Sequence, residues 1–151
     1  MAELKEMIKL IENLYTMERM IAAMEKEPRY YNTDQLLYTN EVHTLKVIAQ
    51  FEGITQKELT EKMFRTKGAT SIIINKLEKK DLVVRREDKD DARMYRLYLT
   101  EKGRIVNDSH IRFDEVKISS WLEDLKFTED ELRQTNHLLE TVAKYVEEHV
   151  L

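Results

Sequence analysis

The stretch TQKELTEKMFRTKGATSIIINKL, residues 55–77, contains the signals of two short helices joined by a tight turn. Thr55 and Glu58 have the spacing of a capping box, in which the hydroxyl and the carboxylate each accept a backbone amide hydrogen bond at a helix start. The chain starts again at Thr66, a second N-cap residue. Apolar or small side chains then recur at 70, 73, 74 and 77, which is the period of one helical face. Residues 55–77 therefore predict a helix-turn-helix.

A β-hairpin is expected directly after this pair of helices. Leu82–Arg86 is rich in β-forming residues, residues 87–93 form a charged tip, and Met94–Thr100 alternates in polarity. Two short helices followed by such a hairpin form a winged helix-turn-helix. In that fold the second helix enters the major groove of DNA, and the hairpin, or wing, lies along the adjacent backbone or minor groove.

The second helix presents a polar face if its period-four residues face the core. The residues expected to point outward are Lys67, Gly68, Ser71, Ile72, Asn75 and Lys76. Asn and Ser can hydrogen-bond to base edges, Lys can bind phosphates, and Gly permits close backbone approach. Ile72 has two interpretations: contact with a thymine methyl group, or burial in the core if the helix is slightly rotated.

Four further helices are expected on either side of this centre. The apolar periods and caps predict them from Leu4 to about Met24, from Thr39 or Asn40 to Gly53, from Thr100 toward Trp121, and from the capping box at Thr128 and Glu131 to the C-terminus. Pro28 and the residues up to Asp34 predict a connector without helical period. The fold class is therefore mainly α with a small β-hairpin wing, divided into residues 1–38, 39–103 and 104–151.

Composition narrows the class of protein. The 151 residues are 42% hydrophobic and 36% charged, with three Gly and one Pro, which indicates a folded, helix-rich chain. The absence of Cys excludes disulfides and thiol chemistry. The N-terminus has no basic segment followed by an apolar run, and no stretch is long and apolar enough for a membrane span, so a cytoplasmic location without membrane contact is expected.

The net charge of −4 conceals two regions of opposite sign. Residues 55–104 contain 14 Lys or Arg and 9 Asp or Glu, whereas the remainder contains 11 basic and 20 acidic residues. A basic centre between acidic arms is compatible with a nucleic-acid partner despite the acidic total.

Three motifs give the chain a family resemblance. They are Leu77-Glu78-Lys79-Lys80, then Asp91-Ala92-Arg93, then Leu99-Thr100-Glu101-Lys102-Gly103. At this spacing residues 41–103 resemble the DNA-binding domain of MarR-family transcriptional regulators, and the helix order fits over nearly the whole chain. Asp81 departs from the pattern, because the family usually has Gly there, and the helix end is expected to differ.

The resemblance implies roles for particular residues. Arg93 would enter the minor groove with Asp91 orienting it, and Arg85, Arg86 and Lys89 become candidate phosphate contacts. Thr55, Gln56 and Thr66 complete the predicted DNA-binding set. The alternative for the hairpin is a solvated structure whose charges protect a sheet edge.

The resemblance also assigns the arms. The first and the last two helices would interleave between two subunits, although their apolar stripes could equally close the monomer's own core. Tyr30, Tyr31 and His43 are the candidates for a small-molecule effector site between the dimer helices and the DNA-binding lobe.

The sequence therefore predicts a homodimeric, sequence-specific regulator of transcription. By resemblance it would be a repressor that binds a palindromic duplex and is released by an effector. No nucleophile motif, Gly-rich phosphate loop or cofactor motif occurs, so neither an enzyme nor a cofactor is expected.

Two alternatives remain open. One is a metal-responsive regulator using His43, His110 and Asp114, with Glu25 as a further carboxylate, because His110 and Asp114 have i, i+4 spacing and zinc-sensing members of the family resemble this arrangement. The other is a winged helix that binds protein instead of DNA.

Overall fold

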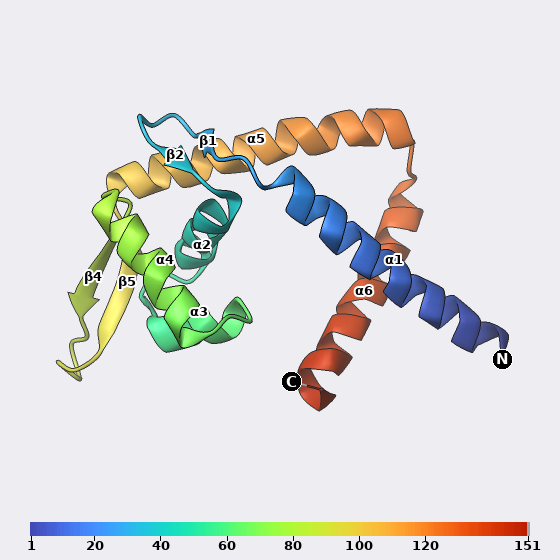
Figure 1. The fold of residues 1–151 in the computed structure, drawn as a ribbon, viewed down its shortest axis with the longest axis horizontal. Coiled ribbons are helices and arrows are strands. Elements are labelled where there is room, and N and C mark those ends of the chain that lie inside the picture. The colour runs from blue at the N-terminus through green and yellow to red at the C-terminus, as the bar shows by residue number, and fades with distance from the viewer. Residues whose placement is uncertain (151) are drawn as a thin grey trace. The chain divides into compact units, whose positions relative to one another are not determined.

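A computed structural model of the chain describes residues 1–150 and confirms the predicted order of helices and hairpin (Figure 1). The helices are α1 (Ala2–Met24), α2 (Thr39–Gln50), α3 (Gln56–Lys62), α4 (Lys67–Lys79), α5 (Glu101–Leu125) and α6 (Glu129–His149). The strands are β1 (Arg29–Tyr30), β2 (Leu36–Leu37), β3 (Ile54–Thr55), β4 (Val83–Glu87) and β5 (Tyr95–Leu99). The chain forms two compact units, Met1–Ile111 and a second that begins at Arg112. None of the helices in residues 1–150 is both long enough and apolar enough to cross a bilayer.

The hydrophobic core lies in the first unit, where α2, α3 and α4 pack with the β4–β5 hairpin (Figure 1). Thr70, Ile73, Ile74 and Leu77 of α4 are all buried, as the apolar period predicts. We call this packed region of the first unit the lobe. Its other fully buried side chains are Leu37, Val42, Leu45, Ile48, Leu59, Leu82, Leu97 and Val106. Because this core fixes the rotation of α4, it also fixes which residues of α4 face outward.

A three-stranded antiparallel sheet forms the base of the wing. Its strand order is β3-β5-β4, with Leu97 of β5 between Ile54 of β3 and Arg85 of β4. The hairpin is as predicted, whereas the two-residue strand β3 is an addition. It ties the start of α3 to the wing, because Thr55 is both its last residue and the N-cap of α3.

The junction between the wing and α5 explains the Leu-Thr-x-x-Gly motif. The Thr100 hydroxyl donates to the Asp81 carbonyl at 2.7 Å and accepts from the Gly103 amide at 3.0 Å, so Thr100 caps α5 as predicted. A Cβ on Gly103 would lie 2.1 Å from the Leu82 carbonyl oxygen. Only Gly allows this close approach of the helix to the chain before β4.

Three local predictions need correction or extension. The N-cap of α2 is Tyr38, not Thr39 or Asn40, because the Glu41 carboxylate accepts the Tyr38 amide at 2.9 Å. The connector contains the short β1–β2 hairpin. Asp81 adopts φ of 56°, so the chain makes the left-handed turn that Gly would favour, and the expected difference at this helix end is wrong.

The long helices α1 and α6 contrast with this lobe. Neither has a buried residue, although each carries an apolar stripe. Thr128 caps α6 through the predicted capping box with Glu131.

Candidate nucleic-acid interface

The outward face of α4 carries the polar residues that the sequence placed there. Lys67, Gly68, Asn75 and Lys76 are exposed and Ser71 is half-buried. Thr66 caps the helix by accepting the Ala69 amide at 3.2 Å. Ile72 is 58% exposed, which resolves its two interpretations in favour of the outer face. We refer to residues 67, 68, 71, 72, 75 and 76 as the outer face of α4.

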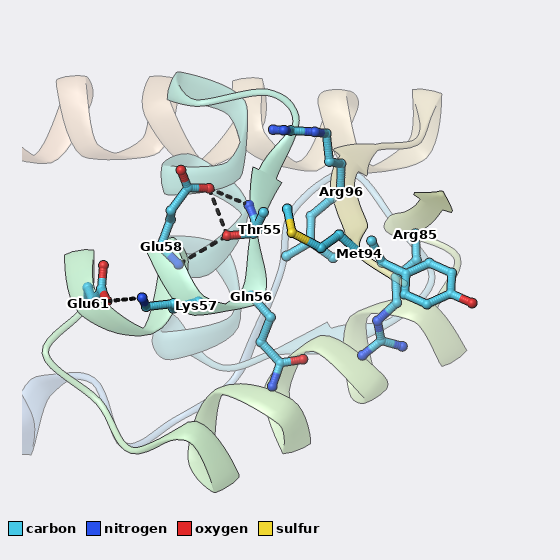
Figure 2. A pocket seen from close by; sticks show the side chains of 10 residues that line it. Thr55, Gln56, Lys57, Glu58, Glu61, Arg85, Met94 and Arg96 are labelled. Atoms are coloured by element: carbon cyan, nitrogen blue, oxygen red, sulfur yellow. Dashed lines mark hydrogen bonds and ion pairs between the residues drawn. The ribbon is translucent and has the colours of Figure 1, made fainter. Parts of the chain in front are cut away.

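A groove of about 470 Å³ separates the start of α3 from the wing (Figure 2). Its lining includes Thr55, Gln56 and Lys57 on one side and Arg85, Tyr95 and Arg96 on the other. Glu58 accepts the Thr55 amide at 2.8 Å, and this bond lowers the pKa of the Glu58 carboxyl. The capping box therefore fixes the rim of the groove where Gln56 and Lys57 begin α3.

The base of the wing is tied to α4 by Arg85. Its guanidinium reaches from β4 toward α4 (Figure 2). There Nη1 pairs with Glu78, and Nη2 donates to Asn75 Oδ1 at 3.0 Å. The Arg85 and Glu78 side chains are each 28% exposed. Arg85 is thus engaged with two side chains of α4, in contrast to the solvent-facing cation that a phosphate contact requires.

The wing itself is braced by Asp88. This carboxylate pairs with Arg96 and accepts the Asp90 and Asp91 amides at 2.8 and 3.1 Å. The hydrogen bond from Arg96, followed by those from the two amides, lowers the pKa of Asp88. Arg96 also donates to the Gly53 carbonyl at 2.9 Å, which links the wing to the turn before β3.

The tip of the wing carries two exposed cations, Lys89 and Arg93, among acidic residues. Arg93 is 92% exposed in its side chain, and its backbone amide and Nε lie 3.0 and 3.3 Å from Asp91 Oδ1. Lys89 and Arg86 are exposed, with the Arg86 guanidinium 5.0 Å from the centre of the Tyr98 ring. The structure therefore places Asp91 beside Arg93, as the resemblance implies.

The position of α4 is fixed by Lys80 and Arg65, two charged residues for which the sequence predicts no role. Lys80 donates to both oxygens of Glu41, at 2.7 and 2.9 Å, and to the Leu36 carbonyl; Glu41 is 2% exposed. Arg65, in the turn before α4, donates to Thr44 Oγ1 of α2 at 2.9 Å. Each bond joins residues at least 21 positions apart, and the sequence contains no local signal for either.

The effector and metal candidates lie away from α4. Tyr31 and His43 each place a ring beside His110, with centroids 5.5 and 5.2 Å apart, while Tyr30 is exposed. Of the metal candidates, His43 and His110 belong to the first compact unit and Asp114 to the second. Glu25, the residue after α1, also belongs to the first unit.

Comparisons with known proteins agree with this architecture. Residues 36–94 match the sequence model of the MarR family. The HTH-type transcriptional regulator SarZ of Staphylococcus aureus is 34% identical over 83 residues, 55% of this chain and 55% of SarZ, so the match spans about half the length of this curated relative.

Two solved structures share the fold over nearly the whole chain. FabT of Streptococcus pneumoniae, solved in complex with DNA, has a TM-score of 0.72 at 22% identity, covering 93% of this chain and 96% of FabT. A MarR protein from Peptoclostridium difficile has a TM-score of 0.66 at 26% identity, covering 96% and 87%.

Proposed function

We propose that this chain is a MarR-family winged helix-turn-helix protein that regulates transcription by binding duplex DNA. In this proposal the outer face of α4 reads the major groove, and the wing tip at Arg93 enters the adjacent minor groove. The observation that carries the proposal is the division of α4 into a fully buried face and a polar, exposed face beside a basic wing.

Two copies of the chain would provide the two lobes that a palindromic site requires. Exposed apolar side chains are concentrated on the long helices: Leu4, Met7, Ile8, Met17, Met20, Ile21 and Met24 on α1, Phe113, Val116, Ile118, Trp121, Leu122 and Leu125 on α5, and Leu132, Leu138 and Tyr145 on α6. Apolar surface on this scale is costly in water and typical of an interface. We infer that a second copy covers it and that the resulting two-fold axis makes the preferred operator an inverted repeat.

The direction of regulation rests on the family alone. By family resemblance we extend the proposal to repression that is relieved by a small molecule bound near Tyr31 and His43. If a bound effector changed the distance between the two lobes so that it no longer matched the spacing of successive major grooves, affinity for the operator would fall.

Selection from a random duplex library, followed by titration of the enriched duplex against salt, tests the proposal. We expect an inverted repeat whose affinity falls steeply as ionic strength rises, because Lys and Arg displace counterions from phosphates. Scrambled duplex of the same composition is the control. Absence of binding to any duplex at low salt would overturn the proposal and favour a winged helix that binds protein instead of DNA.

We propose as a second candidate function a response to a metal ion bound by His43 and His110, whose ring centroids lie 5.2 Å apart, with a carboxylate such as that of Asp114. Imidazole nitrogens with a carboxylate suit Zn²⁺, and binding to the folded state would raise its thermal stability. Melting of metal-stripped protein with and without Zn²⁺, repeated with His110→Ala, tests this candidate. An increase in the wild type that the variant lacks supports it, and identical responses overturn it.

A further inference from the structure

Asn75 sits on the outer face of α4 with one side of its amide already occupied. Arg85 Nη2 lies 3.0 Å from Asn75 Oδ1, and Nη1 of the same guanidinium pairs with Glu78. Glu78 lies one turn further along α4, so the planar group is held at two points by one helix face. Asn75 itself is exposed.

The chemistry of this contact fixes which way the amide faces. A guanidinium has five donors and no acceptor, so the Asn75 atom facing it must be the amide oxygen. The amide NH₂ is consequently the part of Asn75 directed away from Arg85. The same pairing turns the oxygen toward a cation and occupies one of its two lone pairs.

Base recognition by Asn depends on the availability of both ends of the amide. Bidentate binding of adenine needs the oxygen to accept from N6 while the NH₂ donates to N7. Guanine O6 and thymine O4 are keto oxygens that need only a donor, whereas an amide that offers only a donor can bond to adenine N7 but leaves the adjacent N6 donor without an acceptor. Cytosine N4 is a donor and needs an acceptor.

We propose that Arg85 is a positioning residue that makes Asn75 a hydrogen-bond donor, so that α4 selects a keto base, guanine or thymine, at the position Asn75 meets. This inference rests on the proposed function, because it describes how α4 would read DNA. It assigns Arg85 a role other than the phosphate contact that the family resemblance implies.

The two roles of Arg85 predict different outcomes for its variants. A positioning residue affects the ratio of affinities for duplexes that differ only at one base pair. A phosphate contact affects all duplexes equally and contributes to the salt dependence of binding. Arg85→Lys retains a charge but lacks the fork that holds both partners, and Arg85→Ala removes both.

The experiment selects duplexes with the wild type and then measures affinity for four versions of the best site, one for each base at the position that Asn75→Ala makes indifferent. We expect the wild type to prefer the keto bases about tenfold over adenine and cytosine. Arg85→Ala and Arg85→Lys should reduce this ratio toward one, with adenine gaining most. Asn75→Asp keeps an oxygen for Arg85 but has no donor, and should move the preference toward cytosine.

Arg86→Ala is the matched control. Arg86 is the next residue of β4, it is exposed, and its guanidinium lies over the Tyr98 ring. This variant should weaken all four duplexes equally. Melting curves establish whether each variant is folded. If Arg85→Ala does not fold, Arg85→Lys and Asn75→Asp are sufficient to test the proposal.

The outcomes separate this inference from the proposed function. A wild type that binds its selected site while Arg85→Lys keeps the full keto preference overturns the positioning role. So does a wild-type preference for adenine at that position. A wild type that binds no duplex at low salt overturns the proposed function itself.

Discussion

The winged lobe and the long helices have similar apolar periodicity but different packing. Buried apolar residues extend from Tyr31 to Val106, and none lies in α1 or α6. In α4 the apolar face is covered by the chain's own α2, α3 and sheet, whereas the stripe of α6 remains at best half-buried. An apolar stripe thus indicates that a face requires cover, and only the packed structure distinguishes cover within the chain from cover by a second copy.

The largest expected effect comes from placing a charge in the stripe of α6. Val142 is half-buried, and Val142→Glu would put a carboxylate into the proposed interface. We expect a folded monomer, because α6 contributes nothing to the core, and a loss of about 100-fold in affinity for an inverted repeat, because each lobe then binds alone. Sedimentation and duplex titration on the same sample measure both.

Thr141→Glu is the control for this substitution, since it places the same charge on the neighbouring, exposed residue. A Val142→Glu protein that remains dimeric and binds as tightly as the wild type would show that α6 does not join the subunits. Loss of the folded lobe in Val142→Glu would instead indicate that the stripe closes the monomer's own core.

A smaller effect should separate two glycines of the lobe. A Cβ on Gly103 would clash with the Leu82 carbonyl, whereas one on Gly68 meets no atom within 4 Å. We expect Gly103→Ala to lower the free energy of unfolding by about 2 kcal/mol, and Gly68→Ala to raise it by about 0.5 kcal/mol through helix propensity. Urea unfolding measures both, and equal stabilities would contradict the close packing at Gly103.

How far the sequence predicts this molecule depends on the range of the interaction. The buried face of α4 and the caps at Thr55, Thr66 and Thr128 depend on residues within four positions, and all are confirmed. Strands β1 to β3 are two residues each and are defined by their partners, so no local period marks them. Residue type and period predict the exposed face of α4, but not the contacts that its residues make.

The missed contacts share one cause. Lys80 with Glu41 and Arg85 with Asn75 are pairs of polar residues that, in sequence, resemble a solvated surface. Their significance depends on which residues the fold brings together. A buried Glu41 is an acceptable core residue only because Lys80 and the Tyr38 amide satisfy it.

The wing tip should matter for DNA and not for stability. Arg93 is almost fully exposed, so Arg93→Ala should leave unfolding unchanged while weakening duplex binding by about tenfold, the value of a hydrogen bond to a charged group. Arg133→Ala removes an exposed arginine of α6 and should leave binding unchanged. Equal affinities of the two variants would remove the wing tip from the interface.

The smallest expected effect compares the same capping box in the two regions. Thr55 with Glu58 begins α3 in the lobe, and Thr128 with Glu131 begins α6. In each box the threonine amide, then its hydroxyl, donates to the carboxylate and lowers its pKa. A carboxyl whose pKa is lowered by folding stabilises the folded state above its unfolded pKa, and this contribution is lost as pH falls through the lowered value.

Thr55→Ala should therefore cost about 1 kcal/mol in unfolding of the lobe at neutral pH, and this difference from the wild type should shrink on acidification below the ordinary glutamate range. Thr128→Ala should fray α6 while leaving the unfolding of the lobe unchanged, because α6 has no buried residue. Hydrogen exchange resolved by segment, at neutral and acid pH, distinguishes the two variants. Equal destabilisation of α4 amides by both would show that α6 and the lobe unfold as one unit, and would contradict the contrast between a lobe that closes its own core and a helix that does not.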